Sequence, residues 1–141
     1  MVALVDLVQF QLDSANELEQ VLSDETQAIT QRISSQIESV ALKKNELVER
    51  LKITDQRIAA HPDVTKLSDD DNLSAKVSDI QAIITRCQEI NLVNGEALAR
   101  AEMSFRKLNN LLQETNRKAG MTYNAGGKTQ SISTLGTNIK A

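Results

Sequence analysis

In the second half of the chain, a row of mostly apolar residues recurs at strictly alternating steps of four and three positions. We call this row the seam. The seam consists of Leu73, Val77, Ile80, Ile84, Cys87, Asn91, Asn94, Leu98, Ala101, Phe105, Leu108, Leu112 and Thr115. This heptad repeat is typical of a helix that winds around a partner helix. It predicts a helix over about 69–119, which Gly120 ends. Ser68 and Asp71 resemble a capping box at its start, where acidic residues suit a helix N-terminus.

The first half also predicts a long helix, but with a different period. Its stripe consists of Leu18, Leu22, Glu25, Ile29, Ile33, Ile37, Val40, Lys44, Leu47, Leu51, Thr54 and Ile58. The mean step is about 3.6 residues, which indicates a nearly straight helix over about 2–60. Pro62 ends this helix because the residue before a proline is driven out of the α region, and 61–68 is the predicted turn.

Two long helices joined by a short turn are expected to lie antiparallel. The charges favour this orientation, since 1–31 carries acids and no Lys or Arg, whereas the end of the second helix is rich in both. The predicted fold is all-α: a long antiparallel, coiled-coil-like helical hairpin over 1–120 with a flexible or short-helical C-terminal tail over 121–141. The two periods differ, which leaves room for a third helix or a partner. The apolar residues within 2–10 are expected to overhang the hairpin.

Composition argues against several classes of protein. Aromatic residues make up 2% of the chain, there is no Trp, and the net charge is −3. A basic nucleic-acid-binding face with stacking aromatics is therefore not expected. A single Cys excludes a disulfide framework and fits the reducing cytosol. The N-terminus lacks the basic region and cleavage site of a signal peptide, and no apolar run approaches the roughly 20 residues of a membrane span.

The sequence shows no constellation of catalytic or metal-binding residues. His61 is interpreted as part of the helix end before Pro62, and Cys87 as a small core residue on the seam rather than a nucleophile. No second His or Cys is available for a metal site. The GGKT stretch at 126–129 lacks the first Gly and the preceding strand of a phosphate-binding loop. We therefore expect no enzymatic activity, no cofactor and no metal.

The stretch INLVNGEAL at 90–98 weakens the second helix. Asn91 and Asn94 occupy consecutive seam positions, and Gly95 costs about 1 kcal/mol relative to Ala in a helix interior. The structural interpretation is a polar layer that fixes the register of the helices. A turn near residue 64 would place the two Asn residues opposite Ser34–Ser39. The alternative is that this stretch contacts a partner.

Four segments resemble the FlgN family of flagellar export chaperones, and together they extend over nearly the whole chain. They are LKKNELVERL at 42–51, INLVNGEALA at 90–99, KLNNLLQE at 107–114 and TYNAGG at 122–127. The resemblance implies a cytosolic, non-enzymatic chaperone of type III export. Such a protein would bind the C-terminal helical segments of the hook–filament junction proteins FlgK and FlgL, prevent their premature assembly and deliver them to the export gate.

The resemblance also places the partner contacts at the C-terminal end. Leu108, Leu111, Leu112 and Met121 form a candidate apolar face there. Leu108 and Leu112 are interpreted as packing on the first helix, whereas Leu111 lies off the seam and is the better candidate for partner contact. The family's tail tyrosine is implicated in docking to the cytosolic domain of the gate protein, and only Tyr123 can take that role here.

The tail carries Ile132, Leu135 and Ile139 at spacings that put them on one helical face. An isolated helix of this length is marginal in water. We therefore expect a conditional element that docks on an apolar groove and is displaced when a client helix occupies that groove. The alternative is a solvated end with three incidental aliphatic residues.

Two other functions stay open at this point. One is a structural coiled-coil module without a client, including a homodimer. The other is a chaperone for a different type III secreted subunit, such as flagellin. Stabilisation by a C-terminal peptide of a junction protein would separate the first of these from a junction-protein chaperone.

Overall fold

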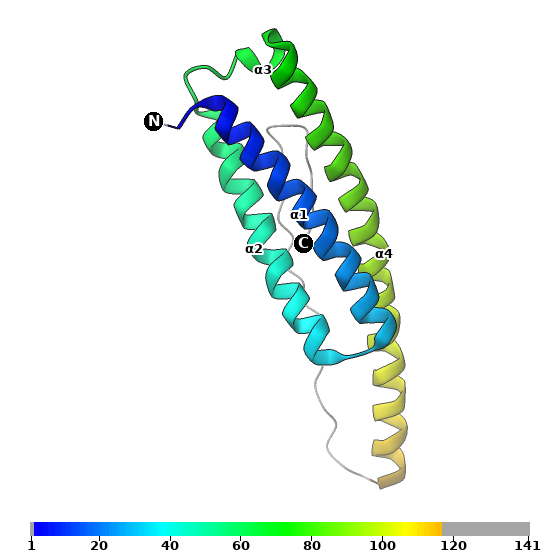
Figure 1. Ribbon diagram of the computed structural model, residues 1–141. Helices are drawn as coiled ribbons and strands as arrows, with labels where there is room; N and C mark the ends of the chain where they lie inside the picture. Colours follow the sequence, from blue (N-terminus) through cyan, green and yellow to red (C-terminus); the bar gives the residue numbers. More distant parts are fainter. Residues whose placement is uncertain (1, 117–141) are drawn as a thin grey trace.

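The computed structural model describes residues 2–116 as an elongated helical structure (Figure 1). Its elements are α1 (Leu4–Gln31), α2 (Ser34–Ala59), the short α3 (Lys66–Asp69) and α4 (Asp71–Asn116). No strand occurs in this part of the chain. The predicted all-α fold built from long helices is confirmed. The predicted tail over 121–141 lies outside the described residues.

The predicted continuous helix over about 2–60 is wrong, because the chain turns sharply between α1 and α2. Arg32 adopts the left-handed conformation with φ 56° and ψ 40°, and its N–H donates to the carbonyl oxygen of Ile29. Ile33 is extended, with φ −100° and ψ 103°, and α2 begins at Ser34. Neither Gly nor Pro stands at this turn, so the usual sequence signals of a helix end are missing. The periodic stripe therefore belongs to two antiparallel helices, and the third helix that the differing periods allowed is present.

The start of α4 also differs from the predicted capping box. The Asp70 carboxylate accepts a hydrogen bond from the backbone N–H of Leu73 at 3.0 Å, as an N-cap side chain does. The Ser68 hydroxyl instead donates to the carbonyl oxygen of Thr65. The predicted turn over 61–68 thus contains most of α3, and α4 starts two residues after the predicted boundary.

Helix α1 packs against both other long helices, and this explains its wide buried face. Two pairs fix the parallel register of α1 and α4: Glu19 with Arg86 and Thr26 with Asn94, separated by 67 and 68 positions. Glu17 with Arg50 places α2 antiparallel to α1. The shared core is formed by Leu4, Leu7, Val8, Ala15, Leu18, Val21, Leu22, Leu47, Val48, Leu51, Ile58, Leu73, Ile80, Ile83, Ile84 and Cys87.

The predicted overhang of the N-terminal residues is wrong. Leu4, Leu7 and Val8 are buried in the core. The carbonyl oxygen of Val2 lies 2.9 Å from Nε2 of His61, so the N-terminus is held beside the end of α2. The prediction failed because the first helix was expected to be twice as long as α1 is.

The overhang lies instead at the other end of the molecule, on α4. At an offset of 68 positions, Gln31 at the end of α1 lies level with Ala99. The remainder of α4, 99–116, extends past the α1–α2 turn (Figure 1). We call this segment distal α4. At 1.5 Å per residue it projects by about 25 Å.

Candidate functional site

A polar layer lies in the bundle shortly before distal α4 begins. Glu25 and Asn94 are almost completely buried, with 1% and 2% of their surface exposed. The amide nitrogen of Asn94 donates to the Leu22 carbonyl oxygen at 3.1 Å and to the Glu25 carboxylate at 3.0 Å. Thr26 donates to the amide oxygen of Asn94 at 2.8 Å. Because both ends of the Asn94 amide are hydrogen-bonded, only one register of α1 and α4 satisfies it.

The same layer joins α2 to the other two helices. The Lys44 ammonium group lies 3.0 Å from the Glu25 carboxylate and donates to the amide oxygen of Asn91 at 3.1 Å. The buried carboxylate therefore has a charged partner from α2 and an amide partner, Asn94, from α4. A buried charge that is paired and hydrogen-bonded in this way fixes geometry more than it adds stability.

The predicted interface position of Asn91 and Asn94 is confirmed, but their predicted neighbours are wrong. They contact Leu22–Thr26 and Lys44 rather than Ser34–Ser39. The turn at Arg32 is the reason, since it places α1 rather than the start of α2 beside this part of α4. No neighbouring helix approaches closely at Gly95, since a Cβ atom added there would meet no atom within 4 Å.

Distal α4 exposes the apolar residues that the sequence singled out. Leu108, Leu111 and Leu112 have 54%, 58% and 49% of their surface exposed. The interpretation that Leu108 and Leu112 pack on the first helix is wrong, because α1 ends level with Ala99. Upstream residues of the same seam, such as Ile80 and Ile84, are buried. The seam therefore continues beyond the helix that covers its first part.

The remaining predicted partner residues lie outside the described part of the chain. They are Met121, Tyr123, Ile132, Leu135 and Ile139. Distal α4 ends five residues before the first of them. The structure thus brings Leu108, Leu111 and Leu112 together on one helical segment and describes nothing of the tail residues.

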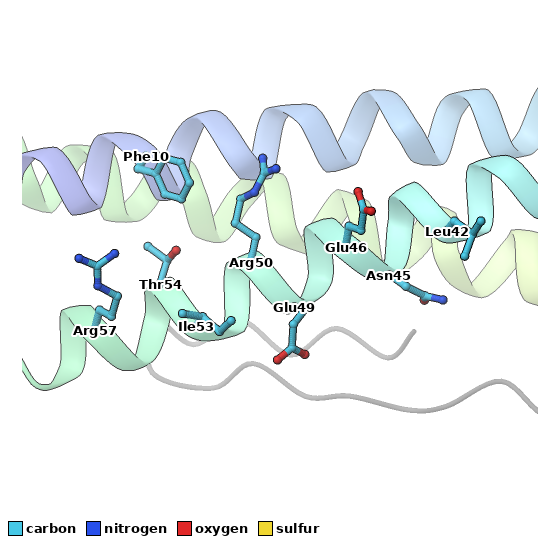
Figure 2. A pocket seen from close by; sticks show the side chains of 9 residues that line it. All are labelled: Phe10, Leu42, Asn45, Glu46, Glu49, Arg50, Ile53, Thr54 and Arg57. Atoms are coloured by element: carbon cyan, nitrogen blue, oxygen red, sulfur yellow. The ribbon is translucent and has the colours of Figure 1, made fainter.

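A second apolar surface was missed by the sequence analysis. A groove of about 640 Å³ runs between α1 and α2, and we call it the α1–α2 groove. Figure 2 shows Phe10 from α1 together with Leu42 and Ile53 from α2, and all three are exposed. Leu42 and Ile53 are separated by about three helical turns and so share one face of α2. That spacing is readable in the sequence, as a second stripe beside the buried one.

The described residues offer no catalytic or metal-binding arrangement. Cys87 is fully buried, and burial raises the pKa of its thiol to about 12, so the nucleophilic thiolate is absent at neutral pH. Nδ1 of His61 accepts a hydrogen bond from the Asp63 backbone N–H, which supports its role at the helix end. Within 2–116 no group of His, Cys, Asp and Glu side chains could hold a metal ion. None of the helices described there combines the length and apolar character that a bilayer crossing requires.

Comparison with known proteins identifies the family. A family model described as FlgN protein matches residues 1–131. No curated protein and no solved structure matches this chain. The matched region includes all four described helices and the beginning of the tail. FlgN proteins are a family of chaperones rather than of enzymes. The chain therefore belongs to the FlgN family, whose members are flagellar export chaperones.

Proposed function

We propose that this chaperone binds the C-terminal helical segments of the junction proteins FlgK and FlgL on distal α4. The observation that carries the proposal is the continuation of the seam past the end of α1. Leu108 and Leu112 occupy seam positions, as Ile80 and Ile84 do, but no residue of α1 reaches their level. A client helix would take up the path that α1 leaves at Gln31.

The chemistry of the surface suits an amphipathic helix. Helix-in-groove recognition uses apolar side chains at three- and four-residue spacings, which is the spacing of Leu108, Leu111 and Leu112. Each leucine fully buried contributes roughly 1.5–3 kcal/mol. Three of them can offset much of the loss of translational and rotational freedom on association, estimated at about 4–15 kcal/mol. Met121 would extend this surface beyond α4.

Covering the client helix would prevent the premature assembly of the junction protein. The same complex would deliver its client in the cytoplasm to the export gate, and Tyr123 would contact the cytosolic domain of the gate protein. Distal α4 ends at Asn116, so a contact through Tyr123 would lie close to the client without using the seam. Tyr123→Ala is therefore expected to weaken gate binding and spare client binding.

The test of client binding compares two pairs of exposed apolar residues in the full-length chain. Leu108→Ser with Leu112→Ser should raise the Kd for a C-terminal peptide of FlgK or FlgL at least about tenfold, which corresponds to 1.4 kcal/mol. Leu42→Ser with Ile53→Ser is the matched control, because these side chains are exposed in the α1–α2 groove. Isothermal titration calorimetry would measure both. Equal affinities for the two variants would contradict the proposal.

The heptad spacing of the same surface also suits a second copy of the chain, as in a structural coiled-coil homodimer. Sedimentation of the free chain separates this function from the first. A dimer that Leu108→Ser with Leu112→Ser converts to a monomer, without any effect of client peptides, would favour the structural module. Binding of a flagellin peptide in place of the junction peptides would identify a chaperone for a different secreted subunit.

A further inference from the structure

The α1–α2 groove is separate from distal α4. All nine residues that line it belong to α1 and α2 (Figure 2). One side is held in place by Arg50, whose guanidinium lies 5.8 Å from the centre of the Phe10 ring and 3.0 Å from the Glu17 carboxylate. Leu42 and Ile53 lie along the other side, exposed. The groove therefore presents three apolar side chains on a surface that is already ordered.

The chain itself supplies a segment that can reach this groove. The Glu25–Lys44 pair and the offset between α1 and α4 place Leu42 roughly level with Gly95, about 30 Å along the axis from Asn116 at 1.5 Å per residue. From Asn116 to Ile132 an extended chain spans about 50 Å at 3.3 Å per residue. An extended tail is thus long enough for Ile132 to reach the Leu42 end of the groove and for Ile139 to reach the Ile53 end.

The charges and the apolar pattern of that segment fit the groove. Residues 128–140 contain three aliphatic residues, two Lys and no acid. Glu46 and Glu49 line the groove, and neither forms an ion pair with any described residue. These carboxylates lie between Leu42 and Ile53 on α2, so the docked segment would pass them without an acid of its own.

A tethered segment suits the groove better than a second copy of the chain. Three apolar side chains are a small surface compared with the roughly 800 Å² per partner that a stable interface buries. A segment of the same chain can bind with a smaller buried surface, because its tether makes the binding intramolecular.

We propose that residues 128–140 of the C-terminal tail dock in the α1–α2 groove of their own chain. Ile132 and Leu135 lie against Leu42, and Ile139 lies against Ile53 and Phe10. Tail and client then occupy different surfaces. The proposal is therefore independent of client binding on distal α4.

A nitroxide label on the full-length chain tests this docking. Ser133→Cys places the label between two of the aliphatic residues, and Cys87→Ala ensures that it attaches nowhere else. The amide signals of Leu42, Glu46 and Ile53 should be broadened, whereas that of Glu89, on the exposed surface of α4, serves as the control and should not be. Replacing Ile132, Leu135 and Ile139 together by Ser should remove the broadening.

Three outcomes would overturn the proposal. The first is broadening of Leu108 and Leu112 rather than of the groove, which would place the tail on distal α4. The second is broadening of the same strength in a mixture of nitroxide-labelled chains without isotope and isotope-enriched chains without nitroxide, which would indicate a second copy. The third is the absence of broadening at Leu42 and Ile53. Loss of client binding with the broadening intact would contradict only the function proposed for distal α4.

Discussion

The two parts of α4 carry the same repeat and meet opposite environments. In the first part, Ile80, Ile84 and Cys87 are buried against α1 and its neighbours. In distal α4, Leu108 and Leu112 hold the same seam positions and are exposed. A heptad repeat therefore predicts that a helix needs a partner, but it does not say whether that partner belongs to the same chain. The length of the neighbouring helix decides this.

The largest difference between the two parts of α4 is expected in the loss of stability when a side chain of the seam is truncated to Ala. Ile84→Ala should lower the free energy of unfolding by about 2–5 kcal/mol, because it leaves a cavity among packed side chains. Leu108→Ala in the free chain should change it by no more than about 0.5 kcal/mol, as is usual for exposed positions. Urea unfolding followed by circular dichroism would measure both. Equal losses would mean that distal α4 is covered in the free chain.

The next prediction concerns the polar layer that lies just before the boundary between the two parts. Glu25→Gln keeps the shape of the side chain but removes the charge that Lys44 and Asn94 contact. The free energy of unfolding should fall by about 1–3 kcal/mol, the usual cost of leaving buried polar groups poorly paired. Glu17→Gln removes an exposed pair with Arg50 and serves as the control. An equal fall in the free energy of unfolding for both variants would mean that the buried Glu25 contributes no more to stability than the exposed Glu17.

A smaller effect of opposite sign is expected at the turn that ends α1. Arg32 has φ 56°, a conformation that costs a side-chain-bearing residue about 1–2 kcal/mol and glycine almost nothing. Arg32→Gly also increases the conformational entropy of the unfolded chain. The net gain in stability should therefore be about 1 kcal/mol or less, measured by urea unfolding. A loss of stability would show that the Arg32 side chain contributes contacts that outweigh the strain.

The smallest effect is expected from an exposed pair that sets the register of the bundle. The hydrogen bond from Arg86 lowers the pKa of Glu19 below its ordinary value of 4.5. The pair therefore stabilises the fold at pH values above the pKa that Glu19 has in the unfolded chain. This contribution is lost as the pH falls through the lower pKa that Glu19 has in the folded protein. Glu19→Gln should reduce the difference in stability between pH 7 and pH 3 slightly. An unchanged difference would contradict the pairing in solution.

Local patterns predicted much of the helical structure. The seam from Leu73 and the stop at Pro62 predicted the boundaries of α4 and the end of α2 to within a few residues. The turn at Arg32 could not be predicted, since a non-glycine residue in the left-handed conformation leaves no mark in the sequence. That single turn changed the neighbours of Asn91 and Asn94 and moved the overhang from the N-terminus to α4.

The sequence analysis identified the residues of the candidate surface but did not predict correctly which of them are exposed. Leu108, Leu111 and Leu112 were identified from their spacing and from the FlgN resemblance, yet two of them were expected to be covered. Exposure depends on which helix lies alongside, and that is a property of chain length and register rather than of local pattern. The α1–α2 groove was missed for the same reason, because Phe10 joins Leu42 and Ile53 only after the chain has turned at Arg32.

The turn at Arg32 also means that the length of α1 sets how much of α4 stays uncovered, and so how much of it is available to the client helix proposed above. Each heptad inserted into α1 before Arg32 would advance the turn by about 10 Å along the seam at 1.5 Å per residue, and each heptad removed would retract it by the same amount. Within this family, chaperones could thus be matched to longer or shorter client helices by insertions in the first third of the chain. The residues proposed to contact the client would need no change at all.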